Sequence, residues 1–185
     1  MTLDAFLATL DSAPLVASVQ ASPGSPMAED EALLRMARAS LQEGVRVMRL
    51  EGASTISRIK QETSATCIGL IKRSYEASEV YITPTNAEVE ELLGTGCEIV
   101  SLDATERSRP GGEDLGDLIA KCHGAGRLVM ADCDTFGAAQ NAVANGADIL
   151  GPTLAGYTPD AALTRSLSPA DRCTKRSGPS KSKFI

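Results

Sequence analysis

The 185-residue sequence contains no tryptophan, and aromatic residues make up only 3% of the chain. This scarcity argues against the aromatic platforms on which proteins stack single-stranded nucleic acid. A formal net charge of −6 also disfavours binding to a phosphate backbone, so we expect no nucleic-acid partner. No run approaches the roughly 20 apolar residues that a membrane-spanning helix needs, so we expect no membrane partner.

The sequence also lacks any CxxC pair. Its five cysteines are an odd number without the spacing of a metal site, which indicates reduced thiols and no metal centre. The segment Met1–Ala5 has neither a basic region nor a long apolar stretch, as a secretory leader would have. These features together favour a cytoplasmic protein.

Six short apolar runs, each about the length of a β-strand, are spaced along the chain and are followed at once or within a few residues by a polar or charged residue. The runs are 15–19, 45–48, 66–71, 99–102, 128–131 and 149–150. Most of them are separated by stretches with helical spacing, predicted at residues 1–12, 29–43, 54–62, 85–93, 113–124 and 136–144. Strands that alternate with helices indicate an α/β fold with a parallel sheet.

Local signals support these boundaries. Thr85 and Glu88 have the spacing of a capping box, which predicts a helix beginning at Thr85. Gly44 follows the helix predicted at 29–43, in the position that glycine favours after a helix end.

The polar residues that end the runs include Gln20, Arg49, Lys72, Asp103 and Asp132, and the last run leads to Thr153. In a barrel of parallel strands, the carboxyl ends of the strands meet at one mouth, where catalytic groups gather. Such a barrel needs eight strands, and the pattern supplies six βα units. We therefore predict an incomplete (β/α)8 TIM barrel over residues 1–159.

Residues 160–185 have a different character. They hold six Lys or Arg and two Asp, whereas the first 159 residues hold 12 basic and 22 acidic groups. The segment shows almost no apolar periodicity, so it cannot bury enough surface to offset its ordering entropy. We predict a disordered basic tail.

Seven short segments in order resemble the N-acetylmannosamine-6-phosphate 2-epimerase family of sialic-acid and amino-sugar catabolism. They are 17–20 (ASVQ), 48–52 (MRLEG), 69–73 (GLIKR), 82–85 (ITPT), 102–110 (LDATERSRP), 131–133 (ADC) and 151–158 (GPTLAGYT). The resemblance covers roughly residues 3–159. It implies a (β/α)8 barrel that interconverts the 6-phosphates of N-acetylmannosamine and N-acetylglucosamine at carbon 2, without metal or organic cofactor.

The resemblance also implies roles for single residues. Lys72 matches the catalytic lysine, which must remove a proton next to a carbonyl and therefore needs desolvation or a neighbouring cation. Arg49 matches a residue that contacts the substrate and could stabilise the enolate. Gln20 and Asp132 match residues that hold the sugar, and Asp103 and Thr153 lie on family motifs at expected substrate-binding positions. The expected partner is a phosphorylated amino sugar, with a homo-oligomer possible.

The sequence departs from the family in one respect. The family carries a Glu-Gly-Arg motif on a seventh strand, with a glutamate that shares the proton transfer, and a glycine-rich phosphate site nearby. No Glu-Gly-Arg follows Thr158 here. We therefore expect impaired activity, and the abrupt change near residue 160 suggests a shifted reading frame or an early stop.

Simpler interpretations of the same residues stay open. Lys72 and Arg73 could be a solvated strand end, Arg49 and Glu51 an exposed ion pair, and Asp132 the start of a helix. His123, the single histidine, is not expected to be catalytic. The loop 107–110 could bind phosphate or simply be a charged surface loop, and the cysteines are expected to be bystanders.

Two other functions also stay open. The chain could be a different sugar-phosphate barrel enzyme, such as an aldolase that uses Lys72 as a Schiff base. It could instead be an inactive fragment that only associates with other chains through open sheet edges.

Overall fold

A computed structural model describes residues 1–159, 161, 183 and 184. Within these residues the strands form one parallel sheet in chain order, β1-β2-β3-β4-β5-β6-β7. The strands are β1 (Val16–Val19), β2 (Val47–Glu51), β3 (Thr66–Leu70), β4 (Ile99–Asp103), β5 (Leu128–Asp132), β6 (Ile149–Gly151) and β7 (Lys183–Phe184). The helices are α1 (Leu3–Ser12), α2 (Asp30–Gln42), α3 (Ala53–Glu62), α4 (Asn86–Leu93), α5 (Leu115–Gly124) and α6 (Phe136–Ala144), with a short 3₁₀ turn at Pro110–Gly112.

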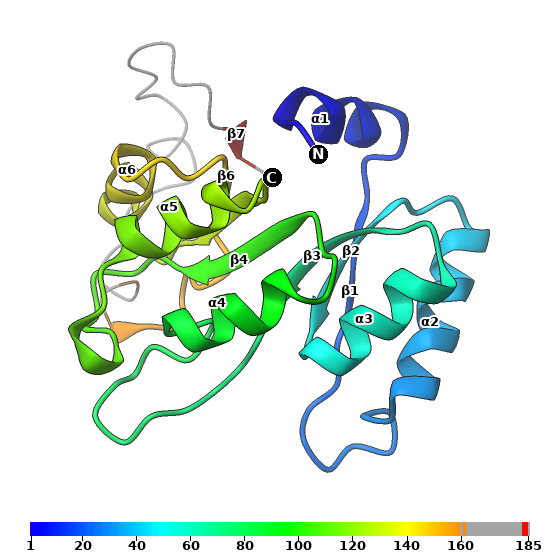
Figure 1. Cartoon of the computed structure of the whole chain (residues 1–185), viewed down its shortest axis with the longest axis horizontal. Coiled ribbons are helices and arrows are strands. Elements are labelled where there is room, and N and C mark those ends of the chain that lie inside the picture. Colours follow the sequence, from blue (N-terminus) through cyan, green and yellow to red (C-terminus); the bar gives the residue numbers. More distant parts are fainter. Residues whose placement is uncertain (160, 162–182, 185) are drawn as a thin grey trace.

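The sheet is curled, and helices α2 to α6 lie on its outer side, as in part of a (β/α) barrel (Figure 1). This confirms the predicted incomplete TIM barrel with six alternating strand–helix units. The pairing of Lys183–Phe184 with β6 was not anticipated. The rest of the predicted tail, at 160, 162–182 and 185, lies outside the described residues.

The local signals in the sequence correspond to local geometry. Thr85 caps α4: its side chain accepts a hydrogen bond from the helix, while Glu88 bonds back to the Thr85 backbone, which confirms the capping box. Gly44 has a φ of 91° directly after the end of α2, where a side chain would be strained.

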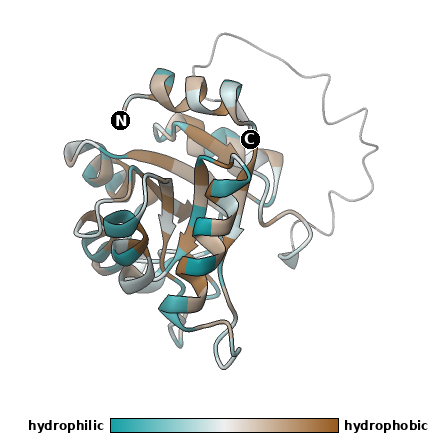
Figure 2. Cartoon of the chain, turned by 90° about the vertical axis from the view of Figure 1, so that its right-hand side faces the viewer, coloured by the Kyte–Doolittle hydropathy of each residue, from teal (hydrophilic) through white to brown (hydrophobic). Residues whose placement is uncertain are grey.

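The outer face of the sheet forms the main core with the helices. It contains alternate strand residues, including Met48, Leu50, Val100 and Leu102, all of them fully buried. Figure 2 shows the result as apolar strands covered by helices whose outward sides are hydrophilic. This is the layering expected when helices cover a parallel sheet.

The inner face has a second, smaller core near the amino ends of the strands. Phe6 of α1 is fully buried there with six strand residues, Val47, Ile68, Ile99, Leu128, Met130 and Ile149. Helix α1 therefore closes that end of the curled sheet, and the carboxyl ends of the strands form the opposite, polar end. No helix among the described residues is long and apolar enough to cross a membrane.

Candidate active site

The polar end of the inner face follows from the two-residue period of the strands. Val47 of β2 lies in the inner core, so Arg49, two residues later, faces the same way. By the same alternation Ser101 follows Ile99 on β4, and Asp132 follows Met130 on β5. The apolar inner core thus changes into a polar layer within two residues along each of these strands.

Arg49 and Asp132 form an ion pair across this inner face. Nη2 of Arg49 lies 2.6 Å from Oδ2 of Asp132, although the residues are 83 positions apart in sequence. The Asp132 side chain is fully buried and that of Arg49 is 15% exposed. Ser101 donates to the same Oδ2 at 2.7 Å, and Thr153 donates to Oδ1 at 2.6 Å.

The surroundings of Asp132 set its charge. Burial raises the pKa of this carboxyl, while the positive charge of Arg49 and the hydroxyls of Thr153 and Ser101 oppose the rise. Nε of Arg49 is buried and has no hydrogen-bond partner among the described residues. A buried donor without a partner leaves hydrogen-bonding capacity that a substrate oxygen can use.

Lys72 follows Leu70 of β3 by two residues, so the alternation of the strand continues to it on the inner side. Its backbone N–H donates to Oε1 of Glu51 at 3.3 Å, which ties the end of β3 to the end of β2. Lys72 is exposed, and so are Arg73 and Ser74 beside it. Among the described residues, its amine has no hydrogen bond or ion pair with a neighbouring side chain.

The other predicted site residues have mixed surroundings. Gln20 is half-buried, and its Nε2 donates to Oγ of Ser18 at 3.0 Å. Thr153 is exposed as a whole residue, but its hydroxyl donates a hydrogen bond to Asp132. Asp103 is fully buried and both of its carboxylate oxygens are occupied, one by Thr105 and the other by Arg107.

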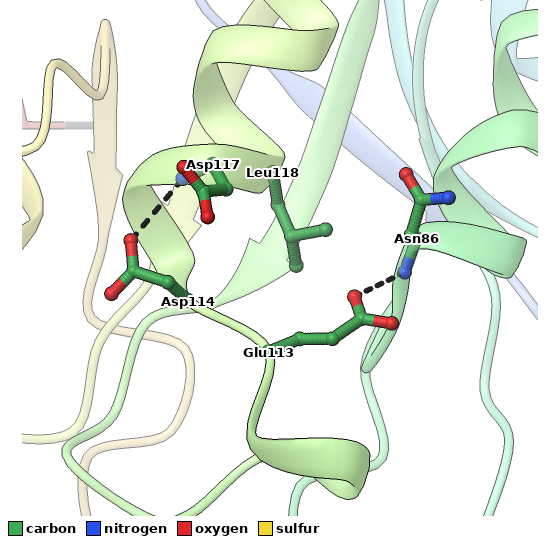
Figure 3. A pocket seen from close by; sticks show the side chains of 5 residues that line it. All are labelled: Asn86, Glu113, Asp114, Asp117 and Leu118. Atoms are coloured by element: carbon green, nitrogen blue, oxygen red, sulfur yellow. Dashed lines mark hydrogen bonds between the residues drawn. The ribbon is translucent and has the colours of Figure 1, made fainter.

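Two hollows lie away from this inner face. One, of about 220 Å³, lies between the amino ends of α4 and α5 and is lined by Asn86, Glu113, Asp114, Asp117 and Leu118 (Figure 3). There Glu113 accepts from the Asn86 backbone at 2.6 Å. A second, of about 290 Å³, runs along the loop after β4 and includes Arg107 and Arg109. Neither hollow contains Arg49, Lys72 or Asp132.

Comparison of the sequence with known proteins identifies the family of this chain. A sequence profile described as putative N-acetylmannosamine-6-phosphate epimerase matches residues 33–168. The chain belongs to this epimerase family.

Curated relatives agree with the family assignment. The chain is 46% identical over 145 residues to a putative N-acetylmannosamine-6-phosphate 2-epimerase of Clostridium perfringens, covering 78% of this chain and 66% of that protein. It is 42% identical over 159 residues to a protein of the same name from Thermosynechococcus vestitus, covering 85% and 69%. The chain thus spans about two thirds of the length of such relatives.

Solved structures show the same relationship. The N-acetylmannosamine-6-phosphate 2-epimerase from Clostridium perfringens superposes with a TM-score of 0.77 at 44% identity, over 78% of this chain and 63% of that one. A 4-hydroxy-2-oxoglutarate/2-dehydro-3-deoxyphosphogluconate aldolase superposes with a TM-score of 0.60 over the whole chain and 76% of its own. At 17% identity the aldolase shares the fold alone.

Three interpretations of these residues that the sequence left open can be compared with the structure. Lys72 lies at a strand end open to water, with Arg73 and Ser74 beside it exposed too, which agrees with a solvated strand end and not with desolvation of the amine. Arg49 does not pair with Glu51, because the curled sheet brings it to Asp132 instead. Asp132 does not begin a helix, since Thr135 caps α6.

The remaining expectations concern groups outside the polar layer. Nε2 of His123 lies 2.9 Å from Oδ2 of Asp148, which also accepts from the Val129 N–H near the amino end of β5, so the pair is not part of the polar layer at the carboxyl ends. Cys133 is buried, and burial raises the pKa of its thiol to about 12, so it is no nucleophile at neutral pH. Cys67, Cys97 and Cys122 are also free and buried, and Cys173 lies outside the described residues.

Sequence reasoning missed Ser101 and the backbone role of Glu51. Ser101 is a fully buried polar residue in the middle of an apolar run, and it shares the inner face with Ile99. A hydroxyl inside the core of a strand needs a hydrogen-bond partner, so the position of Ser101 in the apolar run could have indicated a polar contact at this face. Among the described residues, no group of three or more His, Cys, Asp or Glu side chains is placed to hold a metal ion.

Proposed function

We propose that residues 1–159 carry the carbon-2 chemistry of an N-acetylmannosamine-6-phosphate 2-epimerase. Family membership supports the reaction. The observation that carries the assignment to this site is the buried pair of Arg49 and Asp132 on the inner face of the strand ends, the face to which Lys72 also belongs. In barrels of this kind, catalytic groups generally lie at the carboxyl ends of the strands.

In the proposed reaction, Lys72 acts on the open-chain form of the sugar. The deprotonated form of its amine takes the proton from carbon 2, and the electron pair of that C–H bond moves toward carbon 1, so that the aldehyde oxygen becomes an enolate oxygen. A water molecule on the opposite face of carbon 2 then gives a proton, which inverts the centre and regenerates the carbonyl. The Lys72 ammonium passes the proton it took to the hydroxide left behind. Each turnover therefore consumes no oxidant, reductant or co-reactant.

Arg49 is the proposed stabiliser of the enolate. Its guanidinium is held in place by Asp132, and its buried Nε is still free to donate. Fixed donors aimed at developing negative charge contribute more to rate than mobile ones, because they need no reorganisation during the reaction. We propose that polar groups of the sugar are held by Gln20, Asp132 and Thr153. Both carboxylate oxygens of Asp103 already accept hydrogen bonds from its own loop, which favours a role in shaping the loop after β4.

The proposal extends to the whole molecule in three ways. Residues 1–159 are the proposed folding domain. The substrate is a phosphorylated amino sugar, whose charge keeps it inside a cell, so the proposed location is the cytoplasm. A homo-oligomer is proposed because the described sheet has an unpaired edge at β1.

A carbon-2 exchange assay tests the proposed function. The chain is incubated with N-acetylmannosamine 6-phosphate in heavy water, and the carbon-2 proton is followed by NMR. Replacement of this proton by deuterium needs only one working base, so it detects the first half of the reaction even without net epimerisation. A rate equal to the buffer rate would reject the proposal.

Borohydride treatment separates the aldolase alternative. A Schiff-base aldolase would form a covalent adduct on Lys72 when a keto-sugar phosphate is reduced in place. The epimerase proposal expects exchange without an adduct, and an adduct without exchange would favour the aldolase.

A further inference from the structure

Thr83 has an unusual backbone for a buried, branched residue. Its φ is +44°, and it is the one non-glycine residue with positive φ among the described residues. The side chain is fully buried. Such a conformation is costly for a β-branched residue and persists only where surrounding contacts hold it.

The contacts on one side of Thr83 lead directly to Lys72. The Thr83 N–H donates to the Ile71 carbonyl at 2.7 Å, and the Thr83 hydroxyl accepts from the Ile71 N–H at 3.2 Å. One residue beyond Lys72, the Arg73 N–H donates to the Tyr81 carbonyl at 2.9 Å. The backbone on both sides of Lys72 is therefore held by the returning segment 81–83.

The contacts on the other side of Thr83 lead to Arg109. Arg109 as a residue is 9% exposed, and its guanidinium donates to the carbonyls of Thr83, at 3.3 Å, and of Pro84, at 3.0 Å. It also donates to the carbonyl of Asp103, the last residue of β4. A single planar cation thus joins the end of β4 to the segment that holds the end of β3.

Arg109 reaches this position because the loop after β4 is organised by Asp103. The Asp103 carboxylate accepts from the backbone and hydroxyl of Thr105 and pairs with Arg107 at 2.8 Å. Arg109 itself is extended, as a residue before proline prefers. Burial lowers the pKa of Arg109, and the nearby charge of Asp103 opposes that change. Among the described residues, no carboxylate forms an ion pair with Arg109, so its guanidinium donates to backbone carbonyls instead.

We propose that Arg109 and Thr83 form a clamp that positions Lys72 for proton transfer. The inference rests on the proposed function for the role of Lys72, while the clamp itself rests on the contacts above. Lys72 is exposed, and among the described residues its amine has no partner that would fix the position of the side chain. The position of the amine therefore depends on how firmly the backbone at Lys72 is held. Small displacements of a base from the reacting proton are costly in rate.

Amide hydrogen exchange resolved by residue tests the clamp without relying on catalysis. Arg109→Lys keeps the positive charge but loses the planar fork that reaches three carbonyls. The clamp predicts that the amides of Ile71, Arg73 and Thr83 exchange about tenfold faster in this variant, with little change in β1 and β2. Arg58→Lys, on the outer surface of α3, is the matched control and leaves all these amides unchanged.

Variants of Thr83 probe the other end of the clamp and do not require the Arg109 variant to fold. Thr83→Val keeps the branched shape but removes the acceptor for the Ile71 N–H, whereas Thr83→Ser keeps that acceptor. Faster exchange of Ile71 is expected in Thr83→Val and not in Thr83→Ser. Equal behaviour of the two variants, or loss of protection spread evenly over the sheet in Arg109→Lys, would overturn the clamp.

Carbon-2 exchange kinetics connect the clamp to Lys72. Arg109→Lys is expected to lower kcat about tenfold with little change in KM, because the substrate still binds while the base is displaced. Unchanged kcat despite faster amide exchange would overturn the positioning role. If the unmodified chain shows no carbon-2 exchange at all, the proposed function fails, and the amide experiment still decides whether Arg109 and Thr83 order the end of β3.

Discussion

Arg49 and Asp132 form the pair of charged residues that most directly shapes the polar end of the sheet. A buried ion pair adds little net stability, because desolvation offsets its attraction, but removing one partner leaves the other charge uncompensated. At the residue scale, the pair therefore acts as a fixed arrangement of charge, with Ser101 and Thr153 completing the hydrogen bonds of the carboxylate.

Asp132→Asn removes the negative charge without changing the shape of the side chain. We expect the free energy of unfolding to fall by about 3–5 kcal/mol, because the guanidinium of Arg49 would stay largely buried without its counter-charge. Urea unfolding measures the change. Arg35→Gln is the control, since its salt bridge to Glu31 is exposed and worth about 0–1 kcal/mol. Equal losses in the two variants would contradict a structural role for the buried pair.

The sequence could predict which residues lie at the strand ends but not how they pair. Arg49 and Asp132 each follow an apolar run, and the two-residue period assigns them to one face. Their contact depends on how far the sheet curls, which is a property of the whole sheet. The use of Asp103 by its own loop depends on side-chain geometry between Thr105 and Arg107, which spacing alone does not specify.

At the element scale, α4 contains a buried acid at its capped end. Burial alone would raise the pKa of Glu88, but hydrogen bonds from Thr85 and Tyr75, together with Arg73, outweigh it and lower the pKa. A lowered pKa means that the folded state favours the ionised form. The resulting stability is present above the ordinary glutamate pKa of about 4.3 and is lost as the pH falls through the lowered value.

Glu88→Gln is expected to remove this pH-dependent contribution. The variant should be less stable than the original chain at pH 7, and the difference should shrink as the pH falls below about 4.3. Urea unfolding at several pH values from 7 downward measures it. Glu43→Gln makes the same charge change at an exposed position after α2 and is the control. A difference that stays constant with pH would argue against ionised Glu88 as the stabilising species.

Gly69 of β3 is closely packed by side chains of α3, of α4 and of the segment before β4. A Cβ built there would lie 3.1 Å from Ile56 and 3.2 Å from both Cys97 and Leu92. Gly69→Ala is therefore expected to destabilise the fold by about 1–3 kcal/mol through overpacking. Gly124→Ala, at the exposed end of α5 where a Cβ meets nothing within 4 Å, should be neutral or slightly stabilising. Thermal unfolding of both variants measures the contrast, and a tolerated Gly69→Ala would show that α3 and α4 can move away from β3.

The elements themselves were largely predictable because strands and helices have different periods. The strand at 66–71 begins where predicted, and the helix at 136–144 matches at both ends. The second strand was predicted from its apolar run alone. The observed strand, Val47–Glu51, continues beyond that run through Arg49 to Glu51, toward the polar end of the barrel. The short strand β7 could not be predicted, since Lys183–Phe184 has no strand pattern and is defined by its pairing with β6.

At the scale of the whole molecule, the described sheet is a curled ribbon with β1 at one edge. Exposed strand edges recruit further strands, and Leu15, directly before β1, is 67% exposed. We expect the chain to associate as its concentration rises, which sedimentation velocity would detect. Leu15→Lys should weaken the association, because a charge at a sheet edge opposes pairing. A single compact species across the concentration range, with no effect of Leu15→Lys, would contradict this expectation.

The central claim for the whole molecule is that Lys72 moves the carbon-2 proton at the polar end of the curled sheet. The most direct test compares deuterium incorporation at carbon 2 of N-acetylmannosamine 6-phosphate by the original chain, Lys72→Met and Lys60→Met. Lys60 is paired with Glu98 on the outside of the barrel and serves as the matched lysine. The account predicts incorporation by the original chain and Lys60→Met and none above the buffer rate by Lys72→Met. Equal incorporation by all three would contradict it.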